Sequence, residues 1–129
     1  MVVDSSALLA VLLGEPKGQA MAKALGQADD KRMSAVNFVE ASVVIETRKG
    51  AAGLIELDRL IELSAIEIAA VDERLARDAR TAYRHFGKGR HPAGLNLGDC
   101  FAYALAKFRD EPILCTGNDF AKTDLSVVV

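Results

Sequence analysis

The sequence predicts an α/β fold in which three layers (α/β/α) are built around a short, mainly parallel central sheet. The first observation is that short apolar segments of strand length alternate along the chain with longer segments of helical periodicity. The second is that no two-residue hairpin turn joins successive strand segments, so helices must connect them, as in parallel sheets covered on both faces. The third is the length of 129 residues, without a repeat, low-complexity tract or linker, which fits one domain spanning residues 1–129.

The strand segments are short apolar or alternating runs. Met1–Asp4 begins with two valines and ends in an acid, as expected of a short buried strand. Further strands are expected at Arg32–Ala35, Ser64–Ala69 and Ile113–Thr116, with a final edge strand at Leu125–Val129.

The helical segments are separated by glycine and proline. The run 14–16 (Gly-Glu-Pro) ends the first helix, and the run 50–53 (Gly-Ala-Ala-Gly) interrupts a longer one, which gives a helical hairpin. Asp72 can cap the helix that follows it. Helices are expected at Ala7–Leu13, Lys17–Gln27, Val36–Lys49, Leu54–Leu63 and Asp72–Phe86, and a last one begins near Asp99.

The last helix carries Asp99 in its first turn. Asn96 or Gly98 can cap this helix, Phe101 and Leu105 recur at helical spacing, and a proline ends it. An acid at this position complements the helix dipole, which is the simple interpretation of Asp99. A functional interpretation gains weight from three other acids in the chain.

Glu40 is the most informative of these. A buried helical stripe is expected at Val36, Val39, Val43 and Val44. Glu40 falls in the middle of this stripe, and a carboxylate that faces inward must be paired, protonated or bound to a metal ion. Taken alone, an internal ion pair or a position at the edge of the stripe explains Glu40 equally well.

The four acids can converge at one edge of the sheet. Asp4 and Asp119 directly follow strands and Asp99 begins a helix, so all three can lie beyond the carboxyl ends of the strands. Carboxylates without histidine or cysteine suit Mg²⁺ or Mn²⁺ better than zinc, and they would repel one another without a cation. The sequence therefore predicts a divalent-metal site held by Asp4, Glu40, Asp99 and Asp119.

Such a site can hydrolyse a phosphodiester, because a carboxylate-bound Mg²⁺ keeps several waters and activates one of them for in-line attack. Nearby polar side chains could hydrogen-bond the carboxylates or a bound water: Ser5, Ser6, Asn37, Thr116 and Asn118. For each of them alone, a local cap or turn is the simpler interpretation.

The net charge of −2 gives no overall attraction for nucleic acid, so a polyanion would need a local basic patch. Basic residues recur along the helix from Asp72 and continue into the glycine-rich loop after it: Arg77, Arg80, Arg84, Lys88, Arg90 and His91. These residues could contact the phosphates of a nucleic acid. A solvated helix face, with Glu73 paired to Arg77, is the alternative.

Other features narrow the class of protein. No apolar run approaches the ~20 residues that span a bilayer, and Met1–Asp4 lacks the basic start of a signal peptide, so a cytoplasmic location is expected. Cys100 and Cys115 lie in apolar segments and are expected to be reduced and buried, although a disulfide between them stays open.

Four motifs together resemble the PIN domain and, more narrowly, the VapC toxins of bacterial type II toxin–antitoxin modules. The residues that carry the resemblance are Val2-Val3-Asp4-Ser5-Ser6-Ala7, Asn37-Phe38-Val39-Glu40, Leu97-Gly98-Asp99-Cys100-Phe101-Ala102 and Thr116-Gly117-Asn118-Asp119-Phe120. The resemblance covers essentially the whole chain. It implies a parallel-sheet fold, Mg²⁺- or Mn²⁺-dependent endoribonuclease activity, homodimerisation and inhibition by a VapB antitoxin. It also implies that Asp4, Glu40, Asp99 and Asp119 form the catalytic acidic quartet.

Three other functions remain open at this point. A phosphatase with an aspartate nucleophile usually has a second aspartate two residues later, where this chain has Ser6. A receiver-like phosphoacceptor needs an acidic pair near its first strand. A PIN-like fold could also serve only as a binding module. The apolar hairpin at 36–63 is a candidate dimer or antitoxin surface, although core packing explains most of its residues.

Overall fold

A computed structural model describes residues 1–128. The strands are β1 (Val2–Val3), β2 (Lys31–Ser34), β3 (Ile66–Ala69), β4 (Ile113–Leu114) and β5 (Val127–Val128). The helices are α1 (Ser5–Leu12), α2 (Gly18–Gln27), α3 (Ala35–Leu63), α4 (Glu73–Phe86) and α5 (Leu97–Arg109), with a short 3₁₀ turn η1 (Phe120–Lys122). The strands therefore lie where the sequence predicts them, and only the end of the last predicted strand, Val129, falls outside the described residues.

The sheet has the order β3-β2-β1-β4-β5, and every strand pair in it is parallel. This confirms the predicted α/β class. β1 lies at the centre, and the backbone N–H of Asp4, directly after it, donates to the carbonyl of Leu114 at 2.9 Å. The receiver-like alternative is not supported, because receiver-type doubly wound sheets follow the order 2-1-3-4-5.

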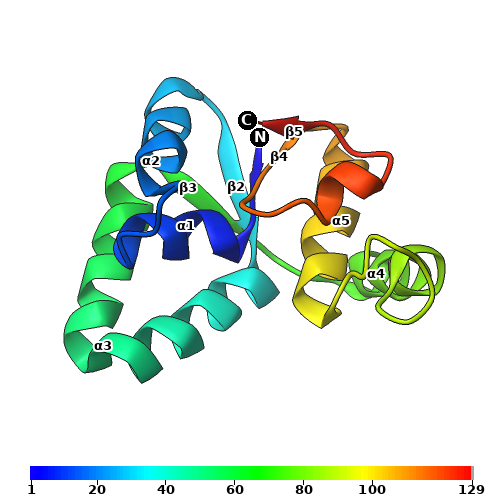
Figure 1. Cartoon of the computed structure of the whole chain (residues 1–129), viewed down its shortest axis with the longest axis horizontal. Coiled ribbons are helices and arrows are strands. Elements are labelled where there is room, and N and C mark those ends of the chain that lie inside the picture. The colour runs from blue at the N-terminus through cyan, green and yellow to red at the C-terminus, as the bar shows by residue number, and fades with distance from the viewer. Residues whose placement is uncertain (129) are drawn as a thin grey trace.

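Helices cover both faces of the sheet, as Figure 1 shows, with α1, α2 and α3 on one side and α4 and α5 on the other. The two valines of β1 face opposite ways. Val3 packs in the cluster that holds Leu8 and Ile45, whereas Val2 packs in the cluster that holds Leu75 and Leu105. The carboxyl ends of the strands point towards the start of α3 and the N-terminal turn of α5, at the lower edge of Figure 1.

Helix α3 departs from the sequence prediction in its buried face. The predicted break is present, because Gly50 has φ 67° and ψ −157° and divides the helix in two. The predicted valine stripe is wrong, however, since Val39 and Val43 are 56% and 59% exposed. The buried positions are Asn37, Ala41 and Ile45, which recur every fourth residue. A polar side chain begins this buried row, so a pattern of apolar residues alone selects the wrong face.

The helix caps follow local signals. Asp72 caps α4 by accepting from the backbone N–H of Leu75 at 2.9 Å. Asn96, rather than Gly98, caps α5, and its partner in a capping box is Asp99. Asp4 caps α1 by accepting from the N–H of Ser6, so this helix begins earlier than the apolar run suggests.

Both cysteines are buried and free, so the structure has no disulfide between Cys100 and Cys115. Among residues 1–128, none of the helices combines the length and the apolar character that crossing a membrane requires.

Candidate metal centre

Asp4 is a buried carboxylate with one unsatisfied oxygen. Its Oδ2 accepts from the backbone N–H of Ser6 at 3.1 Å, and within residues 1–128 its Oδ1 is buried without any hydrogen-bond partner. Burial raises the pKa of Asp4; hydrogen bonds from Ser6 oppose the rise, and the charge of Glu40 adds to it. A buried carboxylate oxygen without a donor is costly unless a cation or water satisfies it.

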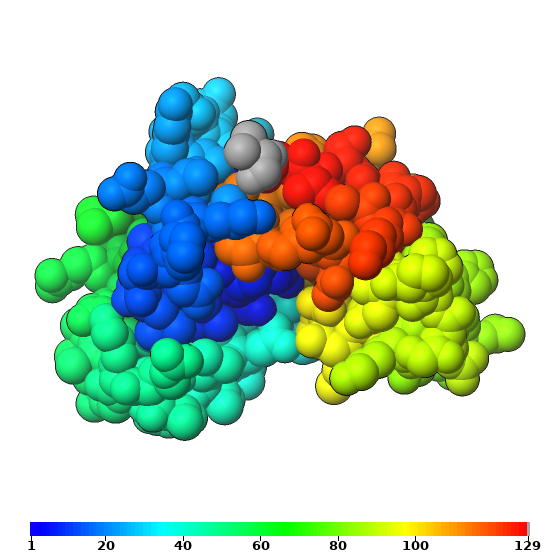
Figure 2. Space-filling view, viewed as in Figure 1, coloured from blue at the N-terminus to red at the C-terminus, as the bar shows by residue number. Residues whose placement is uncertain are grey.

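Glu40 reaches the same edge from α3. Its Oε1 accepts from the hydroxyl of Ser5 at 2.5 Å, and its carboxylate lies directly against the backbone of Gly98 on α5. A Cβ atom at position 98 would be only 2.2 Å from Oε2 of Glu40. The glycine therefore makes room for this carboxylate between α3 and α5, which meet at the lower edge of the molecule in Figure 2.

Asp99 is half-buried at the start of α5. Its Oδ2 accepts from the backbone N–H of Asn96 at 3.0 Å, which completes the capping box. Burial raises the pKa of Asp99 to about 6; the Asn96 hydrogen bond opposes the rise, and the charges of Asp4, Glu40 and Asp119 add to it. The charges of all three other predicted carboxylates thus raise the pKa of Asp99. Asp99 also helps to cap α5, as the simple interpretation expects.

Asp119 is exposed, unlike the other three acids, and lies in the turn before η1. Within residues 1–128, no three Asp, Glu, His or Cys side chains are arranged to hold one metal ion together. The four predicted acids are therefore close enough for their charges to interact, but their side chains are not arranged to coordinate one metal ion together. Their assignment as ligands remains a prediction.

Polar side chains tie the elements of this edge together. Ser6 Oγ accepts from the backbone N–H of Thr116, which follows β4, at 3.1 Å. Asn37 Nδ2 donates to the carbonyl of Gly98 at 2.9 Å and approaches Glu40 Oε1 at 3.5 Å. Asn118 is exposed in the turn after β4.

Ser5 and Gly98 contribute more to this site than the sequence pattern predicts. The pattern indicates Ser5 only as one of several polar neighbours and Gly98 only as a possible cap, yet both contact Glu40. A glycine directly before an acid at a helix start was the available signal.

The predicted RNA-contacting residues lie on α4 and the loop after it. Arg80, Arg84, Lys88 and Arg90 are exposed. Arg77, in contrast, pairs with Glu73 at 2.8 Å, as the alternative interpretation of the helix face expects.

His91 is held within the loop. Its Nδ1 accepts from the N–H of Ala93 at 3.0 Å, and its ring packs edge-on against Phe86 with 4.9 Å between centroids. This arrangement fits a residue that shapes the loop.

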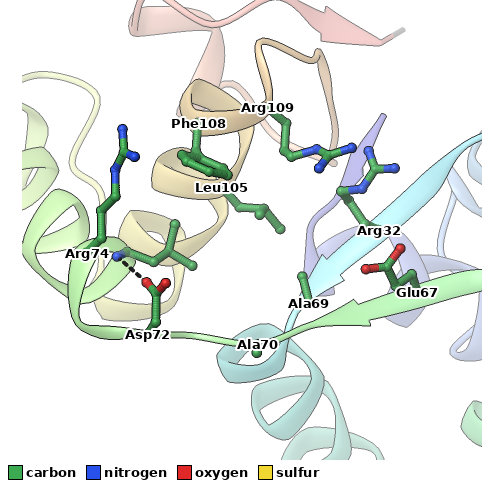
Figure 3. Close-up of a pocket in the computed structure, with 10 residues that line it drawn as sticks. Arg32, Glu67, Ala69, Ala70, Asp72, Arg74, Leu105, Phe108 and Arg109 are labelled. Carbon is green, nitrogen blue, oxygen red and sulfur yellow. Dashed lines mark hydrogen bonds between the residues drawn. The ribbon is translucent and has the colours of Figure 1, made fainter.

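A separate hollow lies between β2, β3, α4 and α5 (Figure 3), and none of the four acids lines it. Arg32 and Arg109 lie side by side there, and both donate to Glu111. On the opposite side Arg74 lies over the ring of Phe108, with 4.8 Å to its centroid. Because two of the three arginines already have a carboxylate partner, this hollow offers little free positive charge.

The sequence matches a known protein family, because the model of the PIN domain family fits residues 1–125. The chain belongs to the PIN-domain family. Curated PIN-domain relatives extend the match over the whole length. "Ribonuclease VapC" of Mycolicibacterium smegmatis is 44% identical over 128 residues, which cover 99% of this chain and 99% of the relative. "Ribonuclease VapC28" of Mycobacterium tuberculosis is 47% identical over 124 residues, covering 95% and 93%. Within the PIN-domain family, the chain is therefore a member of the VapC group.

Two solved structures share this fold. Mycobacterium tuberculosis VapC20, described as a sarcin-ricin loop cleaving toxin, superposes with a TM-score of 0.83 at 12% identity, covering 98% of this chain and 97% of that one. A toxin–antitoxin complex from Klebsiella pneumoniae gives a TM-score of 0.72 at 16% identity, covering 98% and 95%. At such low identity, these two structures support the architecture alone.

Proposed function

We propose that this chain is the toxin of a VapBC toxin–antitoxin module and acts as a Mg²⁺- or Mn²⁺-dependent endoribonuclease. The observation that carries the proposal is Oδ1 of Asp4, which is buried without a hydrogen-bond partner among the described residues and lies near two further carboxylates. Membership of the VapC group supports the same conclusion. Asp4, Glu40 and Asp99 would hold the ion, and Asp119 would complete the site from its turn.

The donor set fits a hard cation, because it consists of carboxylate oxygens. The two cysteines near these acids, Cys100 and Cys115, are buried, which raises the pKa of each thiol and disfavours the thiolate that would bind a softer metal. When bound, such an ion supplies Lewis acidity at a phosphodiester and lowers the pKa of a coordinated water. The protein's own part is to hold the carboxylates in place. Ser5 orients Glu40 by its hydroxyl, Asn37 ties α3 to α5, and Ser6 fixes the turn after β4.

RNA must approach this acidic edge despite the chain's net charge of −2. Four exposed cations on α4 and its loop provide local attraction for phosphates: Arg80, Arg84, Lys88 and Arg90. His91 belongs to the same loop, but its contacts favour a structural role.

The test is cleavage of total cellular RNA by the purified protein in Mg²⁺ or Mn²⁺, and then in EDTA. Discrete cuts that require metal are expected, and Asp99→Asn should abolish them. Glu40→Gln should also lose cleavage but keep its fold, whereas Glu46→Gln, an exposed acid on the same helix, should cleave like the wild type. Titration calorimetry with Mn²⁺ gives an independent readout, and a wild-type protein that binds no metal would disprove the carboxylate site.

The partners follow from the same proposal. A VapB-type antitoxin would neutralise the toxin, and the exposed valines Val39 and Val43 offer a surface for a homodimer. Light scattering after gel filtration tests the dimer. Val43→Lys should give a monomer with an unchanged circular dichroism spectrum, and a wild-type monomer at micromolar concentration would exclude this dimer.

A further inference from the structure

An apolar groove runs between α4 and the N-terminal turn of α5, beside the candidate metal centre. It is lined by Ala76, Ala79, Arg80, Tyr83, Leu97, Cys100 and Phe101 and has a volume of about 330 Å³. Ligand pockets begin at roughly 300 Å³, so the groove is large enough for one flat ring system. Leu97 is 73% exposed and Tyr83 is 39% exposed, which leaves both available to a ligand.

The groove adjoins the acids through α5. Leu97 and Asp99 belong to the first turn of this helix, and Cys100, which follows Asp99, lines the groove. In Figure 1, α4 and the loop after it stand at one end of the molecule, next to this turn. The groove and the candidate metal centre therefore share the first turn of α5.

Tyr83 is held in a fixed orientation. Its hydroxyl donates to the carbonyl of Lys88 at 3.4 Å, and the guanidinium carbon of Arg90 lies 5.6 Å from the ring centroid. Gly87 packs so closely that a Cβ there would lie 2.8 Å from a ring carbon of Tyr83. An aromatic ring fixed in this way loses little conformational entropy when another ring stacks on it.

The charges around the groove favour a polyanion. Arg80 lines it, and Arg84, Lys88 and Arg90 lie on the same helix and loop; in the described part of the chain, none of these four cations forms an ion pair. Unpaired cations around an apolar, aromatic floor are the arrangement by which proteins hold single-stranded RNA, with phosphates on the cations and bases on the rings.

We infer that this groove receives one unpaired base of the RNA, close to the phosphodiester that is cut, with Tyr83 and Leu97 against the base and Arg80 and Arg90 towards the flanking phosphates. This inference rests on the proposed ribonuclease function and adds to it a subsite for a splayed-out base.

The test measures binding without cleavage. Wild-type protein in EDTA is titrated into a short single-stranded RNA that carries fluorescein at one end, and into the same RNA with 2-aminopurine, whose emission falls on stacking. Tyr83→Leu keeps an apolar side chain but removes the ring, and should weaken binding about tenfold and abolish the quenching. Its salt dependence should match that of the wild type. Arg90→Gln should instead make binding less dependent on salt.

Phe108→Leu is the matched control, because Phe108 is also an exposed aromatic residue beneath an arginine, Arg74, but lines the separate hollow. It should bind RNA like the wild type. The inference is overturned if Tyr83→Leu binds and quenches like the wild type, as expected of a groove that receives a protein segment instead, or if wild-type protein does not bind the RNA. The proposed function can fail separately: Tyr83-dependent quenching with no metal-dependent cleavage would keep the base subsite and reject the nuclease.

Discussion

The backbone of Gly98 on α5 lies against the carboxylate of Glu40 on α3, so closely that a Cβ at position 98 would be 2.2 Å from Oε2 of Glu40. Real Cβ atoms do not approach other atoms so closely. The contact therefore fixes Glu40 between two helices that come from distant parts of the chain, and it explains why a glycine precedes Asp99.

Gly98→Ala should keep the fold and lose activity. The new methyl group must push the flexible end of Glu40 aside, at a cost of about 1–3 kcal/mol in the free energy of unfolding. Displacement of a catalytic carboxylate by about 1 Å costs roughly a hundredfold in rate. Metal-dependent RNA cleavage and chemical denaturation measure the two effects. Gly26→Ala, on a surface with nothing within 4 Å of the new methyl, should leave cleavage unchanged.

Asn37→Ala should destabilise the protein. Asn37 is fully buried, and its amide donates to the carbonyl of Gly98 at 2.9 Å. The Gly98 carbonyl keeps its partner within α5, but the hydrogen bond between α3 and α5 is lost, which costs about 0.5–1.5 kcal/mol. Urea denaturation measures the loss. Asn118→Ala, at an exposed turn position, should change stability by no more than about 0.5 kcal/mol. An equal loss of stability in both variants would show that the hydrogen bond between Asn37 and Gly98 does not stabilise the contact between α3 and α5.

Asp99 should make the metal-free protein less stable as the pH rises. Burial raises the pKa of Asp99 in the folded state to about 6, from the ordinary value of 3.8, so the folded state binds a proton more tightly than the unfolded chain does. The stability from this group is present below about pH 4 and is lost as the pH rises through 6. Thermal unfolding in EDTA should therefore show wild type losing stability relative to Asp99→Asn over this range.

Added Mn²⁺ at neutral pH should reverse this loss, because a bound cation stabilises the ionised carboxylates. The melting temperature of the wild type should rise with Mn²⁺ more than that of Asp99→Asn. Equal shifts in the two proteins would place the metal elsewhere.

Glu111→Gln should lower stability without affecting cleavage. Burial alone would raise the pKa of Glu111, but hydrogen bonds from the N-terminal ammonium, Arg32 and Arg109 lower it. Removal of this charge leaves the largely buried Arg32 without its counterion, at a cost of about 2–4 kcal/mol. Urea denaturation at pH 7 gives the value. Glu56→Gln, which breaks an exposed pair with Lys49, should cost less than about 1 kcal/mol.

The features that the sequence predicts well depend on neighbouring residues. Asp72 caps α4 and Gly50 divides α3, because a cap or a break requires only a few residues on either side. The strands lie at the expected positions for the same reason. Their order in the sheet is a different matter, since no local pattern determines that β1 lies between β2 and β4.

The buried face of α3 shows why the rest could not be predicted. Asn37 begins the buried row only because Gly98, 61 residues later, accepts from its amide. Val39 and Val43 look like core residues but point outwards. The periodicity of a sequence shows which residues are apolar, but it does not show which polar residue forms a hydrogen bond with a distant part of the chain.

The central position of β1 has a consequence for synthesis of the protein on the ribosome. β1 completes its pairing only with β4, and the turn that follows β4 carries Asp119 and is tied to Ser6 through Thr116. The acidic edge therefore combines residues that lie 110 positions apart in the chain, Ser6 and Thr116. A nascent chain cannot assemble this edge before β4 and the turn after it emerge, so the candidate metal centre forms late in synthesis.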